Sequence, residues 1–144
     1  MPGIIVGIDG STHSHQALQW AVSEAAARNA PLTVLTVHQA LTSYWGGPVL
    51  AEQDLTLRVR EAAQEETDSV LEKAGEEERP PSVTVRAVTG VPAEELLDAA
   101  ADADLLVVGS RGAGGFKRLL MGSVCTQVTH HAHCPVVVIP ADNT

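Results

Sequence analysis

A glycine-rich stretch in the last third of the chain carries the residue types that bind phosphate. Gly109, Gly112 and Gly122 follow the spacing Gly-x2-Gly-x9-Gly, and Ser123 comes directly after the last of them. Glycines lack a Cβ, so main-chain N–H groups beside them can approach a ligand closely. Gly122 and Ser123 are also predicted to open a helix, whose free N–H groups and partial positive charge favour an anion. The stretch therefore predicts a phosphate site, with Ser123 either capping the helix or giving its hydroxyl to a phosphate.

The distribution of charge favours a small phosphate ligand over a nucleic acid. The formal net charge is −9, and ten of the eighteen acidic residues lie between positions 52 and 78. Three of the nine basic residues lie together in the glycine-rich stretch, at Arg111, Lys117 and Arg118. Nucleic-acid binding needs clustered Lys and Arg over a wide surface, so we expect no nucleic-acid partner. The basic cluster is instead suited to the phosphates of a small ligand.

Histidines and cysteines near the C-terminal end invite a zinc interpretation that the spacing disfavours. His130, His131, His133 and Cys134 lie close together, but structural zinc normally draws two ligand pairs from separated segments, and no second pair stands out. We interpret the histidines as a solvated helix end, where cations are favoured. Cys134 and Cys125 are expected to stay reduced, as small buried thiols.

The elements that must position these residues alternate along the chain. Apolar or alternating runs predict strands over residues 3–9, 31–38, 82–88, 104–109 and 135–140, of which 82–88 has the pattern of a half-exposed edge strand. Helical periodicity predicts a helix capped by Ser11 or Thr12, and further helices over about 50–74, 92–101 and 123–133, with a polar turn over 75–81. The inward stripe of the long acidic helix is predicted to be Leu55, Val59, Ala62, Ala63, Val70 and Ala74. This alternation predicts one α/β domain over residues 1–144: a doubly wound, Rossmann-like, five-stranded parallel sheet with helices on both faces.

Motifs of other phosphate-binding folds do not match. In open α/β sheets the ligand lies beyond the carboxyl ends of the strands, where the strand order reverses, and Asp9 ends the first strand there. The residues after it are not the Gly-x-Gly-x-x-Gly of a dinucleotide site, and Gly122-Ser123 lacks the lysine of a Walker A loop. A phospho-receiver domain would need further acids beside Asp9. Asp9 is thus predicted either to contact the ligand or to cap its own turn.

An ordered set of motifs along the whole chain resembles the universal stress protein family. These are GIDGS after the first strand, a His at the end of the second, Gly90-x-Pro92, LLVVGSRG, MGSV and the terminal CPVVVIP. The glycine spacing of the 109–123 stretch resembles the ATP-binding signature of that family. The resemblance implies an adenine nucleotide alpha hydrolase-like fold that binds ATP, or another adenine nucleotide, with Mg²⁺ or Mn²⁺.

The resemblance also implies a role for each matching residue. Asp9 would reach the ribose or a metal ion held by the phosphates. The phosphate and ribose contacts would come from Gly109, Gly112, Gly122, Ser123 and Val124. Apart from the resemblance, the basic residues Arg111 or Lys117 could supply charge to the phosphates. Adenine would lie near Ile8, Val108 and the end of the second strand, where the match falls on either His38 or Gln39. Gln39 departs from the small apolar residue that some members have there, which would alter affinity or base preference.

These features predict a nucleotide-binding regulatory module of the stress response, with slow ATP hydrolysis as an accompanying activity. The alternatives are a genuine ATPase, for which no residue obviously orients a water, and a dimeric interaction protein that binds no nucleotide. The apolar strand over 135–140, placed at the sheet edge, predicts a homodimer. No segment approaches the ~20 apolar residues of a membrane span, and the first residues lack the basic region of a secretory signal, so we expect a cytoplasmic protein.

Overall fold

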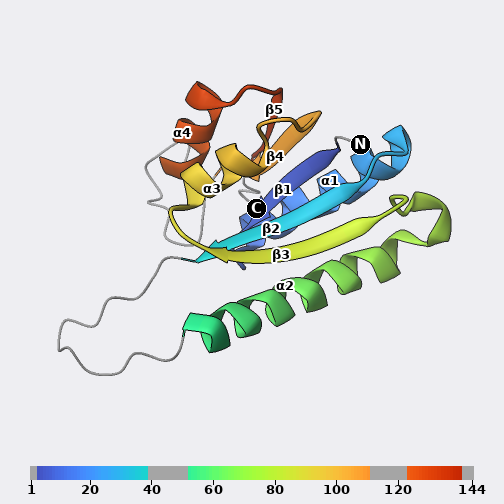
Figure 1. Cartoon of the computed structure of the whole chain (residues 1–144). Coiled ribbons are helices and arrows are strands. Elements are labelled where there is room, and N and C mark those ends of the chain that lie inside the picture. Colours follow the sequence, from blue (N-terminus) through green and yellow to red (C-terminus); the bar gives the residue numbers. More distant parts are fainter. Residues whose placement is uncertain (1–2, 39–51, 111–122, 141–144) are drawn as a thin grey trace.

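The chain folds into a five-stranded parallel sheet between two layers of helices (Figure 1). The computed structural model describes residues 3–38, 52–110 and 123–140. Its strands are β1 (Ile4–Ile8), β2 (Leu32–His38), β3 (Val83–Thr89), β4 (Leu105–Gly109) and β5 (Val136–Ile139). Its helices are α1 (Thr12–Arg28), α2 (Glu52–Ala74), α3 (Pro92–Ala99) and α4 (Ser123–His131), with a short 3₁₀ turn, η1 (Glu76–Glu78).

The strand order is β3-β2-β1-β4-β5, and every neighbouring pair is parallel. This confirms the predicted α/β class and the doubly wound parallel sheet. The central strands β1 and β4 are covered on both faces, which is why they are continuous apolar runs. The strand β3 alternates because it lies at an edge: Val85 is buried, whereas Thr84 and Arg86 are exposed. The other edge is β5, as predicted.

The helices divide into two pairs, each covering one face of the sheet (Figure 1). On one face α1 and α2 pack through aliphatic residues, and α1 crosses β1, β4 and β5. The buried stripe of α1 contains the predicted Leu18, Ala21, Val22 and Ala25, and also Ser14 and Ala17. On the other face α3 and α4 lie against each other and against the sheet. Both predicted helix layers are therefore confirmed.

The structure corrects several predicted details of the helices. On α2, Ala62 is exposed, whereas Thr67 is fully buried. Thr67 tolerates burial because its hydroxyl donates to the carbonyl oxygen of Ala63 at 2.7 Å. The last helix, α4, ends at His131, two residues before its predicted end. The residue before Pro135 is sterically excluded from helical geometry by the proline ring, so the helix has to end before it. The helix α3 ends at Ala99, two residues before its predicted end. Part of the predicted turn after α2 forms the 3₁₀ turn η1.

Candidate functional site

The sheet splits at the point where the strand order reverses. From β1 the chain moves outward to β2 and β3, and it then returns to the other side of β1 to form β4 and β5. Pairing between β1 and β4 stops at Val6 and Val107, although β1 continues to pair with β2 as far as Ile8, and β4 with β5 as far as Gly109. The carboxyl ends of β1 and β4 therefore separate from each other. Such a separation at a switch point is where open α/β sheets bind ligands.

Two predicted site residues, Ile8 and Val108, lie on the two sides of this separation. Ile8 is buried and packs with the core under α1 and α2, whereas Val108 is buried and packs with the core under α3 and α4. Gly109, the last residue of β4, is half-buried beside them. The amide N–H of Ser110 donates to the carbonyl oxygen of Ile139 at 2.8 Å, so β5 holds the end of β4 in place. The structure thus brings the ends of β1 and β4 to one place, as the sequence predicted.

Asp9 directly follows β1, and its carboxylate closes a tight turn. The Oδ1 atom accepts a hydrogen bond from the amide of Ser11 at 2.9 Å, and the residue is exposed. Gly10 has a φ of +84°, a left-handed conformation that favours glycine, which explains why Gly follows the Asp. This geometry agrees with the alternative interpretation, in which Asp9 caps its own turn, and contact between Asp9 and a ligand stays a prediction.

The side chain of Ser14 holds this turn in place through hydrogen bonds. The sequence analysis did not identify this residue. Its side chain is buried, and its Oγ atom accepts from the amide of Asp9 at 3.1 Å while donating to the carbonyl oxygen of Ser11 at 3.1 Å. Its own amide donates to the Oγ atom of Ser11, the N-cap residue of α1. The signal that could have found it is the spacing Asp-x-Ser-x-x-Ser, in which a third polar residue lies one turn inside the helix.

His38, predicted to lie near adenine, has its ring held between α2 and β3. The Nε2 atom lies 2.9 Å from Oγ1 of Thr56 and 3.0 Å from Oγ1 of Thr89. Among the described residues the buried Nδ1 atom has no hydrogen-bond partner. The backbone oxygen accepts from the amide of Gly90 at 2.9 Å. The ring therefore joins the ends of β2 and β3 to the first turns of α2. The alternative adenine neighbour, Gln39, lies outside the described residues.

The N-terminus of α4 begins at Ser123, as predicted. Ser123 is exposed, and Val124 is half-buried against the core under α3 and α4. The first N–H groups of an α-helix have no partner within the helix, so they are free to bind an anion. Three further predicted site residues lie outside the described ranges: Arg111, Gly112 and Gly122. The other two members of the basic cluster, Lys117 and Arg118, also lie outside them.

The thiols and histidines near the C-terminal end form no metal centre in the described ranges. Within residues 3–38, 52–110 and 123–140, no three His, Cys, Asp or Glu side chains are grouped to hold a metal ion. Burial raises the pKa of the Cys125 thiol. Burial also raises the pKa of the Cys134 thiol, with a further rise from the negative charge of Asp104, against an opposing hydrogen bond from the backbone of Leu106. Both thiols are free rather than disulfide-bonded.

The fold, the split sheet and the ordered motifs all agree with one comparison. The model of the universal stress protein family matches residues 2–140. The chain belongs to this family. A universal stress protein of Mycolicibacterium smegmatis is 34% identical over 152 residues, an alignment that covers 98% of this chain and 49% of the relative. A universal stress protein of Mycobacterium tuberculosis is 35% identical over 143 residues, covering 95% of this chain and 47% of the relative. The chain thus spans about half the length of these curated relatives.

Solved structures of the family share the fold over nearly the whole chain. The universal stress protein UspA from Lactobacillus plantarum has a TM-score of 0.80 and 27% identity, covering 96% of this chain and 97% of that one. A universal stress protein in complex with cAMP has a TM-score of 0.67 and 26% identity, covering 96% of both chains. Among the described helices of this family member, none is long and apolar enough to cross a membrane.

Proposed function

We propose that this universal stress protein domain binds ATP, or a related adenine nucleotide, between the carboxyl ends of β1 and β4 and the N-terminus of α4. The observation that carries the proposal is the early end of β1–β4 pairing, which opens the sheet between Ile8 and Val108. A related structure, 26% identical, holds the adenine nucleotide cAMP. The split supplies a place for the nucleotide, and the glycine-rich stretch that follows β4 supplies its phosphate contacts.

The charges at this place fit a nucleotide that carries a metal ion. Asp9 would repel a bare phosphate, but a carboxylate is a good acceptor for ribose hydroxyls and a good ligand for Mg²⁺ or Mn²⁺. The phosphates themselves are matched by the N–H groups at the start of α4 and by Arg111 in the glycine-rich stretch. Asp9 therefore recognises the sugar or the metal, and α4 recognises the anion.

The site favours binding over catalysis. Phosphoryl transfer needs a group that orients the attacking nucleophile in addition to a metal and a cation. Asp9 is already engaged in its own turn, and the His38 ring is engaged by Thr56 and Thr89. We therefore propose a single regulatory domain of the stress response, cytoplasmic, in which any ATP hydrolysis is slow. Single-turnover hydrolysis with purified protein separates this function from that of a genuine ATPase.

Assembly through β5 completes the proposal. The four residues of β5, Val136 to Ile139, are all apolar and all half-buried in the single chain, and β5 lies at the sheet edge. An uncharged edge strand of this kind pairs readily with another strand. A second copy that pairs antiparallel across a two-fold axis would cover it. The nucleotide would then act on a homodimer.

The direct test is isothermal titration of MgATP into the wild type and two variants. Asp9→Asn keeps an oxygen that can accept from Ser11 but removes the charge, and Gly122→Val places a side chain in the expected phosphate space. We expect micromolar binding by the wild type, about tenfold weaker binding by Asp9→Asn, and none by Gly122→Val. Asp98→Asn, which removes an exposed charge near the end of α3, is the matched control. Equal affinity in all four proteins would contradict the proposed site.

The nucleotide content of freshly purified, denatured protein tests the remaining alternative. A dimeric interaction protein that has lost nucleotide binding would release no adenine nucleotide and would bind none on titration. Recovery of adenine nucleotide in a stoichiometric amount supports the proposed function.

A further inference from the structure

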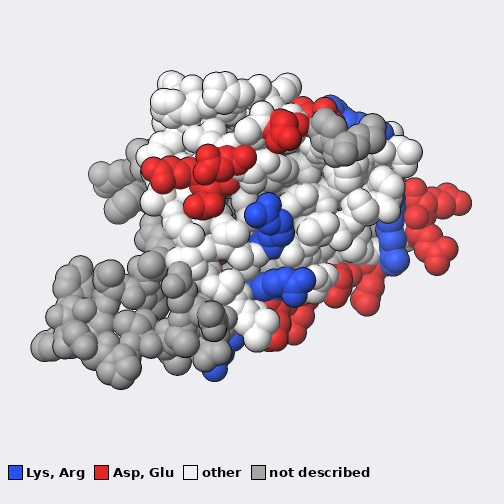
Figure 2. Space-filling model, in the orientation of Figure 1, with Lys and Arg blue, Asp and Glu red and all other residues white. Residues whose placement is uncertain are grey.

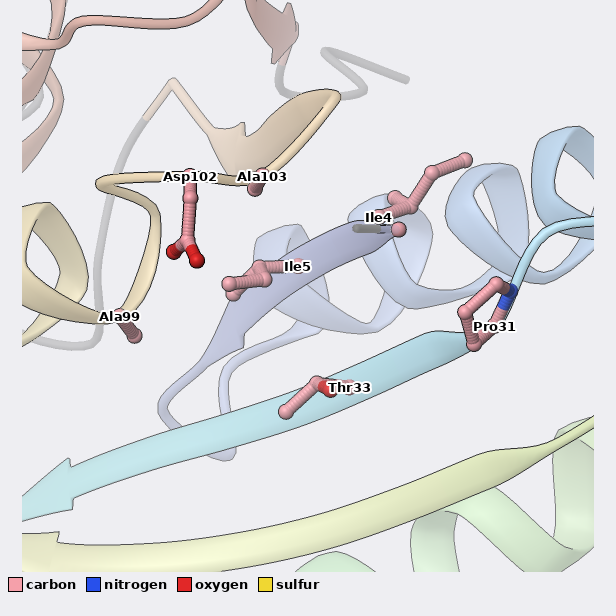
Figure 3. A pocket seen from close by; sticks show the side chains of 8 residues that line it. Ile4, Ile5, Pro31, Thr33, Ala99, Asp102 and Ala103 are labelled. Atoms are coloured by element: carbon pink, nitrogen blue, oxygen red, sulfur yellow. The ribbon is translucent and has the colours of Figure 1, made fainter. Parts of the chain in front are cut away.

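A pocket opens at the end of the sheet opposite to the nucleotide site. It lies at the amino ends of β1 and β2, beside the turn that follows α3, and has a volume of about 340 Å³. Figure 3 shows it between the two strands and that turn. Its walls are formed by Gly3, Ile4, Ile5, Pro31, Thr33, Ala99, Asp102 and Ala103. This volume is at the lower end of the range for pockets that bind one small molecule.

Backbone pairing already uses two of the carbonyl oxygens in the wall. The carbonyl oxygen of Gly3 accepts from the amide of Asp104 at 2.9 Å, and that of Pro31 accepts from the amide of Ile4 at 2.9 Å. Two side-chain groups stay open, the hydroxyl of Thr33 and the carboxylate of Asp102. In the described part of the chain neither has a hydrogen-bond or ion-pair partner. Asp102 is exposed and Thr33 is half-buried. A carboxylate only accepts hydrogen bonds, so a ligand held by Asp102 must bring a donor.

The rest of the pocket is apolar. In Figure 3 the Asp102 carboxylate points inward over Ile5 and Ala99, and the Thr33 side chain rises from β2 on the same side. Ile5 is nearly fully buried and forms the floor, while Ala99, Ala103 and Pro31 contribute only carbon side chains. No lysine or arginine lines the pocket. A ligand that fits must therefore combine a positively charged donor with a small apolar body.

The acids on the pocket side of α3 are Asp98, in the last turn of the helix, and Asp102 and Asp104, in the turn that follows it. Acidic side chains gather on the face of the molecule that carries α3 (Figure 2). Glu94 and Glu95 lie in the first turn of α3, at the other end of the helix, where the Glu95 carboxylate is close to Gly90. The field of the acids on the pocket side raises the local concentration of cations and disfavours anions.

We propose that this pocket binds a small organic ammonium ion, with the ammonium on Asp102 and Thr33 and the apolar body against Ile5 and Ala103. An exposed cation, Arg86, lies on the same face of the neighbouring edge strand but makes no ion pair with Asp102. The carboxylate is therefore available. The proposal does not depend on the nucleotide site, because the pocket lies at the amino ends of β1 and β2 and none of its lining residues is a predicted nucleotide contact.

The test uses benzylamine as the probe, with benzyl alcohol and benzoate as neutral and anionic molecules of similar shape. Amide shifts of the folded, full chain are followed by ¹H–¹⁵N correlation spectra, and the signals to watch are those of Thr33 and Ala103. We expect benzylamine to give saturable shifts at these amides. Benzyl alcohol should bind about three- to fivefold more weakly, the contribution of a partly exposed ion pair, and benzoate should not bind.

Two variants and one control localise the ammonium. Asp102→Asn should weaken benzylamine about three- to fivefold and leave benzyl alcohol unchanged. Thr33→Val should weaken it to a smaller degree, because it removes a neutral partner. Asp98→Asn removes an equal charge from the same face but does not line the pocket, so it should bind as the wild type does. The proposal is overturned if benzylamine gives no saturable shift, if benzyl alcohol binds equally well, or if Asp98→Asn and Asp102→Asn have equal effects.

Discussion

Replacement of Ser14 by Ala tests how the fold holds the predicted ligand-binding carboxylate. The Oγ atom of Ser14 joins the amide of Asp9 to the carbonyl oxygen of Ser11, each at 3.1 Å. The substitution removes both hydrogen bonds without changing the buried volume much, because only one oxygen is lost. The Asp9 carboxylate itself is untouched, and its bond to the amide of Ser11 can persist. Any effect on the ligand therefore passes through the position of the Asp9 backbone.

The loss of stability can be worked out from these contacts. Two hydrogen bonds contribute about 0.5–1.5 kcal/mol each, although the carbonyl of Ser11 keeps a second donor, the amide of His15 at 3.0 Å. The change to Ala in a helix recovers up to about 0.5 kcal/mol of intrinsic helix propensity. The free energy of unfolding should thus fall by about 1 kcal/mol, which lowers the melting temperature by about 3–5 °C in a domain of this size.

Three measurements on Ser14→Ala check the argument. Thermal unfolding gives the stability, hydrogen exchange of the Asp9 amide gives the local effect, and titration with MgATP gives the functional one. We expect the Asp9 amide to exchange faster, beyond the change in global stability, and MgATP to bind about three- to tenfold more weakly. Thr67→Val is the matched control, because it also removes a buried hydroxyl hydrogen bond but lies within α2.

The reasoning about Ser14 is refuted if Ser14→Ala and Thr67→Val bind MgATP equally well. It is also refuted if the hydrogen-exchange rate of the Asp9 amide is unchanged in Ser14→Ala, because the Oγ atom would then contribute nothing to the protection of that amide. A loss of binding in both variants would point to general destabilisation instead of positioning.

Three further predictions follow from charge, edge pairing and burial. Replacing Arg111, Lys117 and Arg118 by Gln together should weaken ATP much more than adenosine in parallel titrations, and an equal loss for both would assign the cluster to structure. Val137→Lys should convert a dimer into a monomer or an aggregate, as followed by light scattering, and a wild-type mass near 15.1 kDa at tens of micromolar protein would contradict the dimer. Because burial raises the pKa of the Cys125 thiol, that thiol favours the folded state most below its unfolded pKa of about 8.5, and its contribution should fall as the pH rises above that value. Stability compared at pH 8 and pH 10 in wild type and Cys125→Ala should show a smaller decline in the variant.

The sequence predicted the architecture because its strands and helices differ in period. A continuous apolar run such as Ile4–Ile8 is explained only by burial on both faces, and the alternation of Val83–Thr89 only by an edge. These two patterns, together with alternating helices, leave few topologies for a parallel sheet. The stripe of α2 was less well predicted. Helical period alone cannot decide between Ala62 and Thr67, because a small apolar residue loses little by exposure and a threonine can satisfy its own hydroxyl inside the helix.

The site was predicted in its residue types but not in its internal connections. Asp9 and Gly109 are recognisable because they end strands at the same edge of the sheet. The role of Ser14 depends on the three-dimensional path of the turn between Asp9 and α1, which residue spacing only suggests. The same limit of sequence-based prediction applies to His38. Its place at the end of β2 was predictable, but its contacts to Thr56 and Thr89 come from residues 18 and 51 positions away in the chain.

The early end of β1–β4 pairing gives this sheet a third edge, in its interior. The outer edges at β3 and β5 can be covered by another strand, because there is room beside them. In the part of the chain that the structure describes, no strand pairs with both β1 and β4 beyond Val6 and Val107, and the proposed function puts a small molecule at this interior edge. Under the proposed function, a ligand seated there would bridge two sets of strands, β3-β2-β1 and β4-β5, whose direct pairing is three residue pairs long. Occupancy of the gap would then be coupled to the relative position of β5, the strand through which we expect two copies to meet.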